Sequence, residues 1–210
     1  RCLGPLAKIG SPVEEALLAK VLANTTALAE FTAPNGRSNI YYTRKLSGFV
    51  QILDFVPSIT DSRGRQREPS ELKVIAFKTR AERDVFLSIL NATFFYWCLT
   101  VFSDCRNLNK REVHGVPFDL RKARRAIVGQ LGQLAGTLMK DVRAHSQLLT
   151  MNYKKYGKLT IQCTYPKHSK SIIDEIDRVL ARHYGFTDEE LDLILNYDIK
   201  YRMGGSGEQS

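Results

Sequence analysis

The spacing of apolar side chains changes from helix-like to strand-like within the first third of the chain. Residues 12–30, PVEEALLAKVLANTTALAE, carry the pattern of an amphipathic helix. Ser11 and Pro12 stand at its start, and this order is typical of a helix N-terminus, because serine accepts a free backbone N–H and proline fits the first turn. We therefore expect a helix over residues 12–30.

Three stretches after the turn at residues 34–36 favour β-strands, since they are rich in Ile, Val, Tyr and Phe. They are SNIYYTRKL at 38–46, GFVQILDFV at 48–56 and ELKVIAFKT at 71–79. The second and third are separated by residues 57–70, PSITDSRGRQREPS. The charges, glycine, prolines and serines of this segment predict a flexible loop.

Two long helices are predicted in the middle of the chain. Residues 80–102 repeat large apolar side chains at three- and four-residue spacing and nearly all round the helix, so this aromatic helix should be buried. Residues 119–149 predict a second, amphipathic helix that opens with RKARR at 121–125. Cations are unfavourable at a helix N-terminus, so we expect an acidic or anionic neighbour there.

The C-terminal residues 169–203 predict a pair of helices. The first, SKSIIDEIDRVLARHYG at 169–185, opens with a serine N-cap pattern and ends on Gly185, which suits a left-handed cap. Thr187 with Glu190 forms the capping-box pattern at the start of the second. Asp and Glu dominate this tail, so the positive charge lies earlier in the chain. Together these elements predict an α+β fold: a mixed β-sheet with a buried aromatic helix, a long supporting helix and a C-terminal helical hairpin.

Composition narrows the class of partner. The chain has 43% hydrophobic residues, enough for a substantial core, and a formal net charge of +9. Such a balance favours an anionic partner, with nucleic acid first and an acidic protein or membrane surface second. The four scattered cysteines match no zinc spacing and indicate reduced thiols, and the longest apolar run, 94–102, is too short to span a bilayer. A cytoplasmic protein without a membrane partner is therefore expected.

One cluster of residues suggests catalysis. The sequence has no glycine-rich nucleotide loop, no HExxH, no GxSxG and no NPPY motif. Asp61 followed by Glu71 and Lys73 matches the D…ExK pattern with which restriction-type nucleases bind Mg²⁺ and orient a water molecule. The same combination also arises by chance, and Asp61 falls in the predicted loop. A Mg²⁺-dependent nuclease is one hypothesis for the function.

The segment SDCRNLNKREV, residues 103–113, carries the most distinctive polar chemistry. Five of its side chains suit DNA: arginine forks for guanine or phosphate, asparagine amides for adenine, and a lysine charge for the backbone. They are Arg106, Arg111, Asn107, Asn109 and Lys110. A solvated connector after a helix C-terminus would have a similar composition. The residues alone leave both interpretations open.

Further candidate contacts come from the strand region. Tyr42, Arg44 and Lys45 interleave aromatic and basic side chains on one predicted hairpin, which is typical of nucleic-acid binding surfaces. A tyrosine buried in a sheet, with charges on the other face, is the alternative. Lys78 and Arg80 add positive charge before the aromatic helix.

Several of these segments together resemble a known family. NIYYTRK, DFVPSI, KVIAF and FLSILNATFFYWCLTVFSDCRNLNKREV occur here in the order found in the C-terminal target-recognition domain of TaqI-like adenine-N6 DNA methyltransferases and related restriction–modification enzymes. That family's Leu-Asn-small-aromatic-Tyr-Trp helix is matched by residues 90–97, and its Ser-Asp/Gly-x-Arg-x-Leu-Asn-Lys-Arg-Glu segment by residues 103–112. The ending SIIDEIDRVLARHYGFTDEELDLILNYDIKYRMG resembles large restriction–modification and phage-exclusion members.

The resemblance implies sequence-specific recognition of double-stranded DNA by a catalytically inert fragment. In that family, an N-terminal domain binds S-adenosylmethionine and methylates adenine, so the parent would be an adenine-specific DNA methyltransferase of bacteria or archaea. The first residue is Arg1 and not Met, which agrees with a fragment, and the fragment itself should need no cofactor. The expected segments are a linker from the missing catalytic domain (1–30), the recognition domain (31–120), the supporting helix (121–150), a helical extension (151–203) and a disordered tail (204–210).

A third hypothesis is a protein-interaction module. In this case the acidic C-terminal tail, residues 169–203, would dock onto a basic surface, either of this chain or of a partner subunit.

Overall fold

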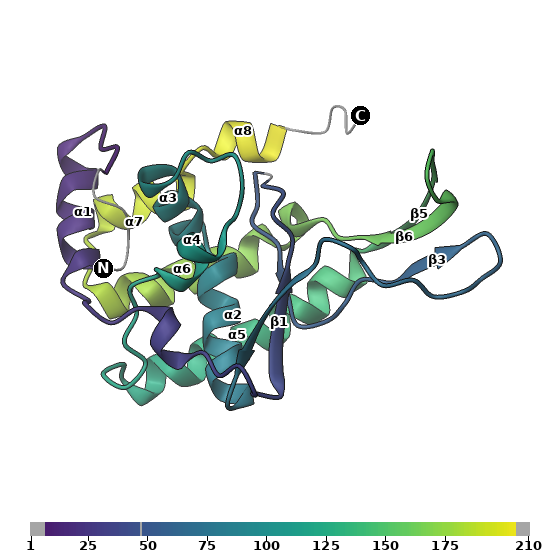
Figure 1. The fold of residues 1–210 in the computed structure, drawn as a ribbon. Helices are drawn as coiled ribbons and strands as arrows, with labels where there is room; N and C mark the ends of the chain where they lie inside the picture. The colour runs from purple at the N-terminus through teal and green to yellow at the C-terminus, as the bar shows by residue number, and fades with distance from the viewer. Residues whose placement is uncertain (1–6, 47, 205–210) are drawn as a thin grey trace.

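Two antiparallel three-stranded sheets and a set of packed helices make up the part of the chain that this computed structural model describes, residues 7–46 and 48–204 (Figure 1). The α+β class predicted from the sequence is confirmed. The predicted mixed sheet is replaced by two separate sheets, each with antiparallel neighbours. The helices gather on one side of the first sheet, and the second sheet projects from the other side (Figure 1).

The first sheet has the order β2-β1-β4, with β2 at Ile52–Leu53, β1 at Ser38–Tyr42 and β4 at Lys73–Phe77. Ser38 pairs with Phe77 at one end and Tyr42 with Lys73 at the other. All three strands lie inside the stretches predicted to be strands, but each is shorter. Gly36 is required before β1, because a Cβ there would lie 2.1 Å from the carbonyl oxygen of Phe77.

The second sheet was not predicted. It has the order β3-β6-β5, with β3 at Ile59–Asp61, β6 at Gly157–Cys163 and β5 at Gln147–Tyr153. The prediction of a flexible loop at 57–70 is therefore wrong, because β3 pairs with β6 across about a hundred residues of sequence. We refer to residues 59–68 and 147–163 as the β-arm; it extends away from the helices (Figure 1).

The predicted aromatic helix is two helices, α2 (Arg80–Asn91) and α3 (Thr93–Phe102), which meet at 65°. The break lies at Ala92, whose extended backbone allows a new helix to start. Asp177 stabilises this start, because its carboxylate accepts the backbone N–H groups of Thr93 at 3.0 Å and Phe94 at 2.9 Å. The prediction of one continuous helix failed because this cap comes from a distant segment.

The first helix is also shorter than predicted. α1 spans Pro12–Leu22, and the hydroxyl of Ser11 accepts the N–H of Glu14 at 3.2 Å, which confirms the predicted start. A 3₁₀ turn, η1 (Leu28–Phe31), follows. The helix ends early because the next segment pairs with the chain around Pro117: Leu28 N–H donates to the carbonyl of Val116 at 2.9 Å.

The long supporting helix, α5, spans Arg125–Ala144, and the short helix α4 spans Lys110–His114. The prediction that the long helix covers 119–149 is wrong at both ends, since residues 119–124 precede it and β5 begins at Gln147. The C-terminal part comprises the 3₁₀ turn η2 (Pro166–Ser169) and the helices α6 (Lys170–Tyr184), α7 (Asp188–Asn196) and α8 (Ile199–Gly204).

Two of the three predicted caps of the C-terminal helix pair are confirmed. The serine cap of α6 does not form, because the hydroxyl of Ser169 donates to the carboxylate of Asp141 at 2.7 Å. Gly185 is left-handed, with φ 72°, and ends α6. The hydroxyl of Thr187 accepts the N–H of Glu190 at 3.2 Å, and the Glu190 carboxylate accepts the N–H of Thr187 at 2.7 Å, which completes a capping box.

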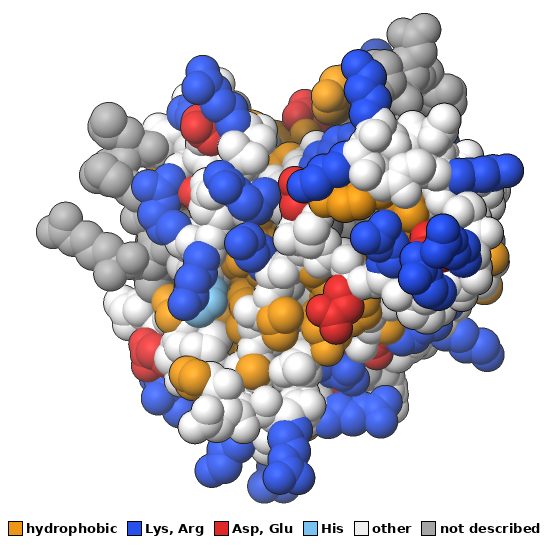
Figure 2. Space-filling view, turned by 45° about the vertical axis from the view of Figure 1, so that its right-hand side comes forward, with side chains coloured by type: hydrophobic (Ala, Val, Ile, Leu, Met, Phe, Trp, Pro, Cys, Tyr) orange, Lys and Arg blue, Asp and Glu red, His pale blue; other side chains and the backbone are white. Residues whose placement is uncertain are grey.

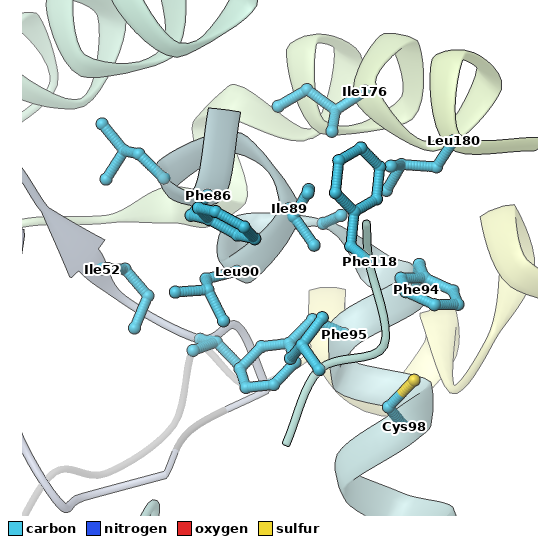
Figure 3. Close-up of a cluster of buried hydrophobic side chains, with 14 of the residues drawn as sticks. Ile52, Phe86, Ile89, Leu90, Phe94, Phe95, Cys98, Phe118, Ile176 and Leu180 are labelled. Carbon is cyan, nitrogen blue, oxygen red and sulfur yellow. The ribbon is translucent and has the colours of Figure 1, made fainter. Parts of the chain in front are cut away.

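The core is continuous from α1 to α7. Figure 3 shows side chains of α2, α3 and α6, among them Phe86, Phe94 and Leu180, meeting around Phe118. Phe86 stacks on Phe77 at 5.5 Å and meets Phe118 edge-on at 6.0 Å. Residues of all four predicted segments between 1 and 203 therefore share one buried cluster. The predicted tail, apart from Gly204, lies outside the described residues.

Among the described residues, no single helix is long and apolar enough to cross a membrane. Helices α2 and α3 reach that length and composition only as a bent pair, and most of their side chains are buried against the rest of the chain.

Candidate nucleic-acid interface

Two of the basic segments predicted to contact DNA lie side by side, the one with Arg44 and Lys45 and the loop at 103–109. The N–H of Leu108, in the 103–109 loop, donates to the carbonyl of Arg44 at 2.9 Å, and the Leu108 side chain is buried. Both segments lie beyond the end of the first sheet where Tyr42 pairs with Lys73. In Figure 1 they run together beside α8. The fold thus joins two candidate segments that are more than sixty residues apart in sequence.

We call the joined surface, Arg44, Lys45 and residues 106–111, the loop platform. Arg44, Lys45, Arg106 and Lys110 are exposed, and within the described part of the chain none of them forms an ion pair. Arg111 pairs with Glu112 at 2.9 Å, yet its side chain stays 71% exposed. Gathered cations of this kind raise the local positive potential and attract polyanions.

The 103–109 loop is held by its own hydrogen bonds. The N–H of Arg106 donates to the carboxylate of Asp104 at 3.1 Å, and Cys105 adopts a left-handed backbone with φ 56°. Asn109 N–H donates to Glu112 at 3.0 Å, and its side-chain amide donates to the carbonyl of Asn107 at 3.3 Å. Asn109 therefore shapes the loop, and Arg106 and Lys110 are the side chains best placed to reach a ligand.

Tyr42 does not belong to this surface. Its side chain is only 4% exposed and faces the core, so the interpretation as a sheet-core tyrosine is confirmed. Burial, together with the nearby Glu112 carboxylate, raises the pKa of the Tyr42 hydroxyl above its ordinary value. Tyr42 is therefore not available to contact DNA from the surface.

Lys78 and Arg80 lie at the opposite end of the first sheet, next to the pairing of Ser38 with Phe77. Four residue steps along β1 separate the two ends, roughly 13 Å of strand. Arg80 forms an ion pair with Asp84 at 3.4 Å and lines an open groove of about 390 Å³ with Arg37, Ser38, Asn39, Tyr41, Asp54 and Arg83. The exposed predicted contacts therefore divide between the two ends of the first sheet.

The residues of the nuclease hypothesis are not brought together in one sheet. Asp61 lies in β3 of the β-arm, whereas Lys73 lies in β4 of the first sheet. The Asp61 carboxylate accepts the backbone N–H groups of Arg65 at 3.1 Å and Arg63 at 2.9 Å and thereby stabilises the turn at Gly64. These hydrogen bonds lower the pKa of Asp61. No group of three His, Cys, Asp or Glu residues that would suit a metal ion occurs within residues 7–46 and 48–204.

The chain itself neutralises the first part of the RKARR cluster, whereas Arg124 and Arg125 are exposed and form no ion pair among the described residues. Arg121 bonds Asp119 at 3.1 Å and Glu30 at 3.1 Å, so the expected acidic neighbours are present and tie η1 to the start of α5. The Asp119 carboxylate also accepts the hydroxyl of Thr26 at 3.0 Å, and its pKa is lowered because its hydrogen bonds outweigh burial. This cluster stabilises the fold.

The acidic tail packs on its own chain. Lys20 of α1 pairs with Glu190 of α7 at 2.6 Å, and Asp177 of α6 caps α3. Asp188, Glu189 and Asp192 remain exposed. The interaction-module hypothesis thus gains an intramolecular contact for the tail, on α1 and α3 and not on the basic loop platform.

Arg202, which the sequence pattern did not indicate, holds the chain at Gly48 and Phe49, shortly after the Arg44 and Lys45 of the loop platform. Its side chain is buried, with Nε donating to the carbonyl of Gly48 at 2.6 Å and the guanidinium 4.3 Å from the ring of Phe49 and 4.8 Å from that of Tyr96. No local pattern marks such a role. The β-arm, by contrast, had a signal: alternating strands on both sides of the turn residues 153–157.

Comparisons with protein-family models, with curated proteins and with solved structures find no match to this chain.

Proposed function

We propose that this chain recognises duplex DNA, as the specificity domain of an adenine-N6 DNA methyltransferase in a restriction–modification or phage-defence system. The observation that carries the proposal is the loop platform: exposed cations from two distant segments, joined by the bond from Leu108 to Arg44. The buried Arg202 holds the chain at Gly48, a few residues beyond Lys45. A rigid support matters, because side chains that read bases must be held at a defined distance from the groove.

The platform side chains divide by chemistry. Arg106, exposed on the 103–109 loop, has the planar fork that matches guanine or phosphate. Arg44, Lys45 and Lys110 supply charges for the phosphate backbone, which dominates affinity. Arg111 keeps its exposed end near Glu112, so its charge is partly neutralised before DNA binds.

Within this proposal, S-adenosylmethionine binding and methyl transfer belong to a catalytic domain outside the sequence given. Residues 7–46 and 48–204 supply recognition, and they work through basic side chains and not through a cofactor. The resemblance of residues 90–112 to target-recognition domains supports this division of labour.

The proposal is tested by measuring duplex binding across a salt series, roughly 50 to 300 mM, with the chain and with Arg106→Ala. Arg106→Ala should weaken binding by about 5- to 150-fold, corresponding to the loss of one arginine contact. Lys140→Ala, which removes an exposed cation on α5, is the charge-matched control and should bind as the unaltered chain does. Affinity that does not change with salt would contradict the proposal.

A further inference from the structure

The β-arm buries few apolar side chains for its length. Its two strands β5 and β6 pair from Gln147↔Cys163 to Tyr153↔Gly157, whereas β3 stops pairing at Asp61↔Leu159, so the tip is a two-stranded ribbon. Leu159 is its one fully buried apolar side chain among the described residues. Isolated ribbons of this kind are marginally stable, which indicates a role outside the core.

The base of the β-arm is nevertheless fixed to the body. The hydroxyl of Thr164 donates to the Gln51 side chain at 2.8 Å, and the Gln162 amide donates to the hydroxyl of Ser146 at 3.0 Å. The N–H of Ser58 donates to Gln162 at 3.2 Å. These bonds hold the ribbon at a set direction relative to the helices, so whatever it contacts is met in a defined orientation.

Positive charge is concentrated on the β-arm. Its two segments contain two carboxylates, Asp61 and Glu68, and the first is already bonded to Arg65 at 2.9 Å. Its cationic side chains come from both segments: Arg63, Arg65, Arg67, Lys154, Lys155 and Lys158. All six are exposed. Figure 2, which turns this side forward, shows Lys and Arg spread over the face with fewer Asp and Glu.

At the tip of the β-arm, two cations contact the ring of Tyr156. The guanidinium of Arg67 lies 5.0 Å from the centre of the Tyr156 ring, and the ammonium of Lys155 lies 5.2 Å from the same ring. The loop after β3 and the turn of the β5–β6 hairpin thus form one basic surface, although they are about ninety residues apart in sequence.

The shape and charge of this surface fit duplex DNA better than a membrane. A two-stranded ribbon is narrow enough to enter the major groove, and cations on both strands can neutralise phosphates. Exposed apolar side chains of β5 lie on both faces, because Leu148 alternates with Met151 and Tyr153 along the strand. Insertion into a membrane needs one contiguous apolar face, which this ribbon lacks.

We propose that the β-arm is a second DNA-binding element, which grips the phosphate backbone of duplex DNA flanking the sequence contacted by the loop platform. This inference rests on the proposed function. The arm adds affinity that is independent of sequence, whereas the platform sets sequence preference. Arm and platform act on the same duplex, so the arm contributes only where the duplex is long enough to reach it.

The test compares two double variants of the full chain on a long and a short duplex over a salt series. Lys154→Ser/Lys155→Ser removes two arm cations, and Lys140→Ser/Lys200→Ser removes two exposed cations elsewhere as the matched control. The arm variant should lose about tenfold or more in affinity for the long duplex, and its salt slope should fall by about two. Affinity for the short duplex and the preference among sequences should stay unchanged. Tyr156→Ser, a second arm variant without loss of charge, should show a smaller loss.

The outcomes separate the two proposals. If the unaltered chain binds DNA with a steep salt dependence and the arm variant matches the control, the arm inference is overturned and the proposed function stands. If the unaltered chain shows no salt-dependent DNA binding, both fall. Binding to anionic vesicles is measured in parallel. If the β-arm variant loses vesicle binding but keeps DNA binding, the β-arm contacts a lipid surface and not DNA, and the inference is overturned.

Discussion

Replacing Arg202 should destabilise the fold and loosen the loop platform at the same time. Arg202 lies in α8 with 4% of its surface exposed, and its guanidinium donates to Gly48 and to the hydroxyl of Thr93 at 3.2 Å. Gly48 belongs to the segment that follows Arg44. Arg202→Ala therefore removes a bond to the segment next to the platform without changing a proposed DNA contact.

The expected loss of unfolding free energy in Arg202→Ala combines favourable contacts of the guanidinium with the opposing cost of burying it. The bond to Gly48, at 2.6 Å, is charge-assisted and contributes about 1.5–3 kcal/mol, and the rings of Phe49 and Tyr96 add about 0.5–2 kcal/mol together. Burial of the guanidinium opposes this and lowers the pKa of Arg202. Truncation also leaves the Gly48 carbonyl without its partner, so Arg202→Ala should cost about 3 kcal/mol of unfolding free energy.

Urea unfolding followed by circular dichroism measures this cost. Arg202→Met keeps the apolar stem, so it should cost about half as much. Lys200→Ala, an exposed change on the same helix, should stay within about 0.5 kcal/mol of the unaltered chain. Limited proteolysis should cut residues 43–50 faster in Arg202→Ala. An Arg202→Ala midpoint equal to that of Lys200→Ala would refute the reasoning.

Three further predictions concern buried groups. Burial raises the pKa of Asp177 from 3.8 to about 6, so the folded protein holds a proton that the unfolded chain releases, and stability should fall as pH rises through this window. Relative to Asp177→Asn, the unaltered chain should lose up to about 3 kcal/mol between pH 4 and 7 in urea titrations; a constant difference would contradict this. Trp97→Phe removes the donor to Glu14 at 3.0 Å and should cost about 1–3 kcal/mol in thermal or urea unfolding, whereas an unchanged midpoint would show that this bond is dispensable. Burial raises the pKa of the Cys98 thiol far above its usual range, so mass spectrometry after iodoacetamide treatment should find Cys105 alkylated in the native protein and Cys98 only after unfolding; native labelling of Cys98 would disprove its burial.

Local chemistry accounts for what could be predicted of the fold. Ser11, Gly185 and Thr187 were identified as caps because a cap depends on residues within one turn of the helix end. The α+β class followed from periodicity. The wrong predictions lie where residues distant in sequence determine the local structure. Asp177 caps a new helix at Thr93, and β6 pairs with residues 59–61 in a sheet. A single sequence carries no direct signal for such pairings.

In the candidate site, too, local features could be predicted and contacts between distant segments could not. Arg106 and Lys110 were found from residue chemistry, and their exposure agrees with a surface role. Tyr42 was misassigned because alternation along a strand does not say which face meets the core. The contact between Leu108 and Arg44, and the support from Arg202, depend on the folded chain and had no counterpart in the sequence pattern.

The central claim is that the loop platform recognises duplex DNA. The most direct measurement is the dissociation constant of Arg106→Ala, with Lys140→Ala as control, on a library of duplex sequences at fixed salt. Arg106→Ala should bind more weakly, with preference relaxed at one base position, while Lys140→Ala should keep the affinity and preference of the unaltered chain. Equal binding by both variants to all sequences would rule out the proposed recognition of DNA by the loop platform.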